Sequence, residues 1–243
     1  MTSMRQLFLI IGITLISVLL KAENYPTKFL GIPIDGTKQE MINRLEEKGF
    51  IYNEEQDWLS GEFNGKEVII YISTKNRKVY GISVRYRYFY TAEEIKSIYN
   101  DLLQQFQKNP KYIPVNLHQS AIPTEEDIAR EMSQNNKEYF AGFLQRTNEA
   151  DSTVTLNDSF KECTNKYIDK LISLMPIDTL YNETEYTKIV ENIGEMCWYE
   201  ELRAMYINNI VGFQIDKAYG ENYILLLIYT NGHNKNIGYE DEL

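Results

Sequence analysis

The clearest pattern in the chain is an alternation of apolar and polar positions over residues 79–88. A period of two is typical of a β-strand with one buried face. Shorter strand-like segments precede it at 50–53, 58–63 and 68–73. The pair Asn64-Gly65 marks a hairpin turn between two of them. The first half of the chain therefore predicts an antiparallel meander.

Two amphipathic helices are predicted beside these strands. The first covers residues 38–48, with Thr37 or Asp35 as its N-cap and Gly49 in the place of a C-cap glycine. The second begins after Thr91 and has apolar residues at helical spacing, namely Ile95, Ile98, Tyr99, Leu102, Leu103 and Phe106. An open antiparallel sheet covered on one face by helices is an α+β fold.

The second half is less regular. The pattern predicts a short helix at 123–133, a strand pair at 139–146 and 153–156, and a closing hairpin of 210–216 and 223–230. Two long helical patterns, 159–175 and 184–206, lie between these strand pairs. We interpret residues 23–243 as a single α+β domain with a helical hairpin inserted at 159–206. Two subdomains divided near 114–123 are the alternative.

The two cysteines of the chain, Cys163 and Cys197, fall on the apolar stripes of the two predicted hairpin helices. Their distances from the helix ends place them at about the same level of an antiparallel hairpin. A disulfide requires that the two cysteines lie at the same level of the hairpin and face the same side. The alternative is a pair of reduced, buried thiols.

Residues 1–22 predict an exported protein. Arg5 precedes an uncharged apolar run from Leu7 to Leu20, and Ala22 suits the position before a cleavage site. The apolar run is shorter than a membrane-spanning helix needs, although an uncleaved anchor is the alternative. We expect a periplasmic or secreted mature chain without a membrane span.

Without residues 1–22 the chain has 23 basic and 35 acidic residues, a net charge of −12. This charge disfavours nucleic acid and anionic lipid as partners. The 19 tyrosines suit both strands and surfaces that bind sugars or peptides.

The sequence predicts no catalytic, cofactor-binding or metal-binding residues. His118 and His233 are the only histidines, and neither has metal-ligand spacing. Residues 31–38 resemble a phosphate loop in which Thr37 and Lys38 are inverted, and we interpret them as a turn and helix cap. Acidic groups at 54–57, 125–127 and 200–201 fit helix starts and solvated faces better than a catalytic carboxylate pair.

The local positive cluster of the chain is the candidate binding surface. Arg85 and Arg87 lie on the polar side of the 79–88 strand, and Lys75, Arg77 and Lys78 lie in the adjoining turn. In an acidic protein such a face suits an anionic ligand or an acidic partner. The alternative is a solvent-exposed sheet face on which the basic residues only prevent association with other strands.

The opening Phe29-Leu-Gly-Ile-Pro-Ile-Asp-Gly-Thr37 resembles that of uncharacterised exported proteins from Bacteroidales-type bacteria. The resemblance extends to Gly61-Glu62-Phe63, to Arg77-Lys78-Val79-Tyr80 and to the acidic end at 240–243. It is best over residues 29–108, and residues 159–206 depart from it. It implies an envelope or secreted location, and no activity is established for that family.

Together these observations favour an exported, non-enzymatic binding or protein-interaction module of the bacterial envelope. Its partner would be an envelope protein or a glycan. The alternative is a carboxylate-based hydrolase that acts on envelope or dietary glycans.

Overall fold

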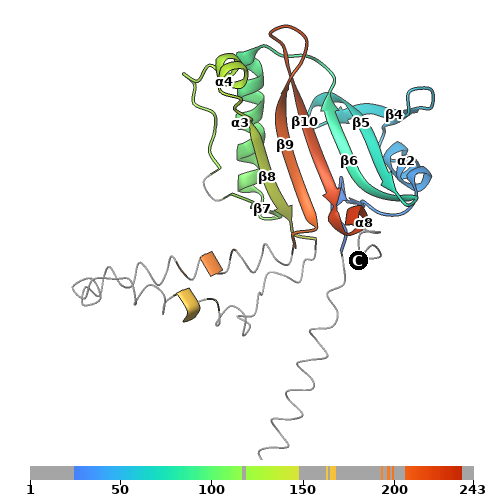
Figure 1. Ribbon diagram of the computed structural model, residues 1–243. Coiled ribbons are helices and arrows are strands. Elements are labelled where there is room, and N and C mark those ends of the chain that lie inside the picture. The colour runs from blue at the N-terminus through green and yellow to red at the C-terminus, as the bar shows by residue number, and fades with distance from the viewer. Residues whose placement is uncertain are drawn as a thin grey trace, which may run out of the picture.

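A computed structural model of the chain describes residues 25–116, 119–147 and 206–236, together with residues 163, 165–167, 193, 196, 197 and 199. One antiparallel sheet of eight strands dominates it, with the order β3-β4-β5-β6-β10-β9-β8-β7 (Figure 1). The strands are β3 (Ile51–Asn53), β4 (Trp58–Phe63), β5 (Lys66–Lys75), β6 (Lys78–Tyr86), β7 (Tyr112–Pro114), β8 (Phe140–Gln145), β9 (Asn209–Lys217) and β10 (Tyr223–Asn231). The described helices are α2 (Lys38–Glu46), α3 (Ala92–Lys108), α4 (Ile128–Gln134) and α8 (Gly232–Asn236). A small hairpin of β1 (Lys28–Phe29) and β2 (Ile32–Pro33) precedes them.

The sheet consists of two units with the same topology. Helix α2 precedes the meander β3-β4-β5-β6, and helix α3 precedes the meander β7-β8-β9-β10. The last strand of each unit lies at the centre of the sheet, where β6 and β10 pair with Val84 opposite Leu227. Both helices lie behind the sheet in Figure 1, α2 over the first meander and α3 over the second. The predicted α+β class is confirmed, and the internal repeat is a feature that the sequence did not predict.

The two covering helices begin in the same way. Thr37 and Glu40 form a capping box at α2, and Thr91 and Glu94 form one at α3. Gly49 then takes a left-handed φ of +93°, as the sequence predicted for the end of the first helix. The residues that mark these helix boundaries are therefore recognisable in the local sequence.

The core lies between the helices and the sheet. Below α3, the Phe106 ring stacks on Phe143 with centroids 4.9 Å apart, and Tyr99 meets Phe213 edge-on at 5.1 Å. Towards α2, the core continues through Met41, Leu45, Ile70 and Val84, among other fully buried residues. Burial of this apolar surface is the main stabilising contribution to the fold.

The N-terminal hairpin is tied to the end of the sheet by buried side chains. The Thr27 hydroxyl donates to the Thr230 carbonyl at 2.6 Å, and the Asn231 amide donates to the Ile34 carbonyl at 2.9 Å. The Asn234 amide of α8 donates to the Asp35 carboxylate at 2.8 Å. The first and last described segments of the chain are therefore held together.

The predicted partner of the 139–146 strand was wrong. Strand β8 pairs on one side with β7 and on the other with β9, where Leu144 lies opposite Ile210. Both edges of β8 are therefore used by strands that are not 153–156. A turn signal at 148–152 suggested a local hairpin, whereas β7 precedes β8 in the chain and β9 begins more than sixty residues after it.

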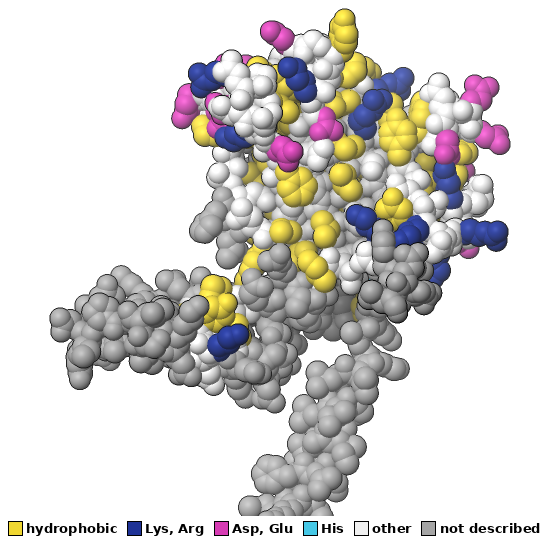
Figure 2. All heavy atoms as spheres, viewed as in Figure 1, with side chains coloured by type: hydrophobic (Ala, Val, Ile, Leu, Met, Phe, Trp, Pro, Cys, Tyr) yellow, Lys and Arg dark blue, Asp and Glu magenta, His cyan; other side chains and the backbone are white. Residues whose placement is uncertain are grey.

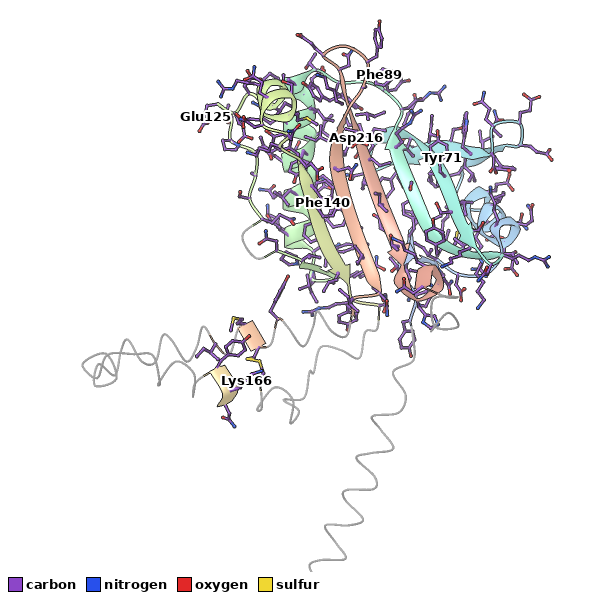
Figure 3. All side chains as sticks on the ribbon, viewed as in Figure 1. Tyr71, Phe89, Glu125, Phe140, Lys166 and Asp216 are labelled. Atoms are coloured by element: carbon purple, nitrogen blue, oxygen red, sulfur yellow. A yellow bond between two sulfur atoms is a disulfide. The ribbon has the colours of Figure 1, made fainter. Side chains whose placement is uncertain are left out.

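The residues between Gln145 and Asn209 form a long connection between two neighbouring strands. Within it, Cys163 and Cys197 form a disulfide with Cα atoms 5.9 Å apart (Figure 3). The described residues 163, 165–167, 193, 196, 197, 199 and 206 are helical, as predicted there. The predicted signal peptide at 1–22, the strand at 153–156, His118 and the acidic C-terminus lie outside the described residues. Within the described part of the chain, no helix has the length and hydropathy to cross a membrane.

Candidate functional site

The candidate site is the face of the sheet opposite α2 and α3, which looks towards the viewer in Figure 1. None of the described helices covers its centre, and Figure 2 shows apolar side chains across it. We call this surface the open face and define it by Ile69, Tyr71, Ser83, Arg85, Phe140, Gln214, Leu226 and Ile228. These residues come from five adjacent strands, β5, β6, β10, β9 and β8.

Strand β10 shows why the open face is unusual. An antiparallel strand with one solvated face normally alternates apolar with polar residues. In β10, the core side carries Leu225, Leu227 and Tyr229, and the other side carries Ile224, Leu226 and Ile228. The run Tyr223-Ile-Leu-Leu-Leu-Ile-Tyr229 is therefore apolar on both faces although a helix covers only one. This run is the sequence signal that could have identified the face.

Phe140 is the most exposed apolar residue of the open face, at 51%. A Cβ atom added to Gly142 or Gly212 would lie 2.9 or 2.7 Å from a ring carbon of Phe140. The ring therefore lies over two glycines on neighbouring strands, and any larger residue there would displace it. Phe140 and Tyr71 mark opposite sides of the face in Figure 3.

Arg85 lies where the sequence placed it, on the outward side of β6. In the sheet it stands between Ile69 of β5 and Leu226 of β10. Its Nε atom is buried and has no hydrogen-bond partner. Burial of a guanidinium donor without an acceptor is unfavourable, so an acceptor supplied from outside would gain from this site.

Arg87 lies beyond the end of β6 and is half exposed. Its guanidinium is 3.5 Å from the Glu67 carboxylate, and its backbone N–H donates to the Glu67 carbonyl. In the adjoining turn, the Lys75 ammonium donates to the carbonyl of Lys235 in α8. The two predicted arginines are thus on one surface, and of these two Arg85 is the one that has a buried donor without an acceptor.

One end of the open face is covered by part of the long connection. Tyr199 and Tyr206 pack against Ile113 and Leu144 in a small cluster separate from the main core. The Tyr199 hydroxyl lies within hydrogen-bond distance of the carbonyl oxygens of Pro114 and Val115 and can donate its proton to either. The connection between β8 and β9 therefore reaches the edge of the same face.

Three of the acidic residues that the sequence singled out, Asp57, Glu126 and Asp127, form local side-chain contacts. Hydrogen bonds from Lys38, and then from Tyr52, lower the pKa of Asp57. Hydrogen bonds from Lys137 and Tyr139 lower the pKa of Glu126 in the same way. Asp127 caps α4 by accepting from the Arg130 N–H at 3.0 Å. Residues 200 and 201 lie outside the described residues.

Of the two histidines, the structure describes His233. His233 is exposed in α8. In the described ranges, no group of three or more His, Cys, Asp or Glu side chains is arranged to hold a metal ion.

A cleft of about 670 Å³ lies on the helix side of the sheet, away from the open face. It is bounded by the C-terminal half of α3, the β1–β2 hairpin, the β4–β5 turn and the ends of β7 and β8. Glu62 is the one carboxylate among its described lining residues, which also include Lys28, Lys111 and Arg146. The cleft is therefore predominantly basic.

Comparison of the chain with protein-family models, with curated proteins and with solved structures finds no significant match.

Proposed function

We propose that this protein is an exported, non-enzymatic interaction module of the bacterial envelope that binds a partner protein on the open face. The observation that carries the proposal is the apolar outward side of β10 beside the buried, unpartnered Nε of Arg85. Contiguous apolar patches on otherwise soluble domains mark interaction sites. Interface centres are enriched in aromatic residues and arginine, which are the residue types found here.

The expected partner presents an apolar centre with a carboxylate placed opposite Arg85. Such a carboxylate would accept the free Nε–H and complete a charge-assisted hydrogen bond. The exported location rests on the pattern of residues 1–22 and on the family resemblance, and the Cys163–Cys197 disulfide agrees with it because such bonds persist in oxidising compartments.

The hydrolase alternative draws little support from the described carboxylates. Asp57 and Glu126 are each held by a lysine and a tyrosine. The cleft has a single acid among its described lining residues, whereas glycoside hydrolysis needs two carboxyl groups about 5–10 Å apart.

Photo-crosslinking tests the proposal directly. A benzoylphenylalanine replaces Tyr71 on the open face, or Tyr219, which is 92% exposed in the β9–β10 turn, as the control position. After irradiation with an envelope extract of the producing cells, we expect one discrete adduct from position 71, identified by mass spectrometry, and none from position 219.

The same adduct should depend on the chemistry of the face. Arg85→Glu should abolish it, because a carboxylate there repels the acidic partner group, while Arg44→Glu at an exposed position of α2 should leave it unchanged. Melting curves establish that both variants are folded. Equal adducts from positions 71 and 219, or an adduct insensitive to Arg85→Glu, would overturn the proposal.

A further inference from the structure

The basic residues of the helix-side cleft have an unusual property for an acidic protein. The chain has 35 acidic and 25 basic residues, yet no ion pair within the described residues involves Lys28, Lys111 or Arg146. All three line the same cleft. Like charges gathered in one concave site raise the local concentration of anions.

A buried glutamine holds the three cations near one another. Gln145 is 6% exposed, and its amide group bonds to the backbone of Lys28 in both directions, at 2.6 and 2.9 Å. Arg146 is the next residue, and its N–H donates to the Lys111 carbonyl at 2.8 Å. These contacts hold the backbones of the three residues close together, and no ion pair of the described residues uses their side chains.

Arg146 carries the specific indication of a ligand. Its Nε atom is buried and has no hydrogen-bond acceptor. Buried donors are satisfied in nearly all native structures, so an orphaned one in a residue that lines a cleft suits an acceptor that comes from outside. A carboxylate or phosphate matches the guanidinium group in geometry and in charge.

The remaining wall is apolar. Phe106 and Leu102 of α3 line the cleft from one side, and Leu30 lines it from the β1–β2 turn. Leu30 is 41% exposed and has a φ of +51°, a left-handed conformation that bulky residues rarely adopt. A turn of this kind favours glycine or asparagine, so leucine adopts this conformation at an energetic cost at a position that lines the cleft.

We propose that this cleft binds a small organic anion with an apolar body. Its carboxylate or phosphate group is held by Arg146, Lys28 and Lys111, and its apolar part lies against Phe106 and Leu30. The volume of about 670 Å³ is in the usual range for small-molecule sites. The site is separate from the open face, so this proposal does not depend on the proposed partner protein.

Calorimetric titration of the purified mature chain tests this site with three probes that share one tail: octanoate, octyl phosphate and octanol. At least one of the two anions should bind with a 1:1 stoichiometry, and the tighter one identifies the preferred headgroup. Octanol should bind at least about tenfold more weakly, because it lacks the charge that Arg146 requires.

Variants separate the two halves of the site. Arg146→Gln and Lys111→Gln should each weaken anion binding by about tenfold, whereas Lys48→Gln, an exposed lysine just after α2, should not. Leu30→Gly should weaken binding of the octyl anions without lowering the melting temperature, because glycine removes the backbone strain. Absence of binding by both anions, equal binding of octanol, or unchanged affinity in a triple variant that carries Lys28→Gln, Lys111→Gln and Arg146→Gln would overturn the proposal.

Discussion

At the scale of single residues, Lys96 shows what helical periodicity cannot predict. It belongs to α3 and is only 5% exposed, although lysine is rarely buried. Its ammonium donates to the carbonyl oxygens of Thr124 and Glu126 at 2.7 and 2.9 Å and lies 3.3 Å from the Glu93 carboxylate. A sequence pattern places this lysine beside an apolar stripe, but only the fold brings the loop at 124–126 to it.

Replacing Lys96 with methionine should therefore destabilise the protein. Methionine fills a similar volume but leaves the two carbonyl oxygens without their charged donor, and such hydrogen bonds contribute about 1.5–3 kcal/mol. We expect a loss of about 1–3 kcal/mol in urea unfolding and faster proteolysis within residues 119–127. Lys108→Met, at an exposed position of the same helix, should have little effect; equal losses for both variants would contradict this role of Lys96.

At the scale of elements, local chemistry accounts for what the sequence predicted well. Helix α3 has both a capping box at Thr91 and an apolar stripe, and its predicted and observed extents nearly coincide. Strand β6 was equally clear because its residues alternate. Strand β10 was predicted as a strand, but its second apolar face was not recognised, because an apolar run has no periodicity that reveals how many of its faces are covered.

Substitution of the N-cap residue of α3 tests quantitatively whether local contacts determine where the helix begins. Thr91 accepts from the Glu94 N–H, and Glu94 accepts from the Thr91 N–H. Thr91→Ala should lower the free energy of unfolding by about 1 kcal/mol, the usual contribution of an N-cap side chain. Ser97→Ala removes a hydroxyl from an exposed interior position of the same helix and should not destabilise, since alanine has the higher helix propensity. A Thr91→Ala variant as stable as the unmodified chain would show that tertiary packing alone sets this helix start.

At the scale of the whole molecule, the sequence did not predict how the two meanders meet. The pairing of β6 with β10 joins residues about 140 positions apart, and nothing local specifies it. The one local trace of the repeat is the Thr-x-x-Glu motif that starts both α2 and α3. The sequence did not predict the open face for the same reason. Its residues are distributed over five strands and form one surface only when the two units share a sheet.

The connection between β8 and β9 should be separable from the sheet if residues 159–206 are an insertion. In the register of these strands, Leu144 lies opposite Ile210, so Thr147 and Ile207 are placed to be joined by a tight turn. Replacing residues 148–206 with Asn-Gly, a preferred two-residue hairpin turn, should give a chain that keeps the strand signal in circular dichroism.

This shortened chain should nevertheless be less stable, because it lacks Tyr199 and Tyr206 and exposes Leu144 and Ile113. Exposing a buried aliphatic side chain costs about 1.5–3 kcal/mol, so we expect a loss of at least that size in urea unfolding. Dithiothreitol should lower the unfolding midpoint of the full chain, which contains the Cys163–Cys197 bond, and leave that of the shortened chain unchanged. A shortened chain without a cooperative transition would instead show that the connection is an integral part of the domain, and that the sheet depends on the packing at its β7–β8 edge.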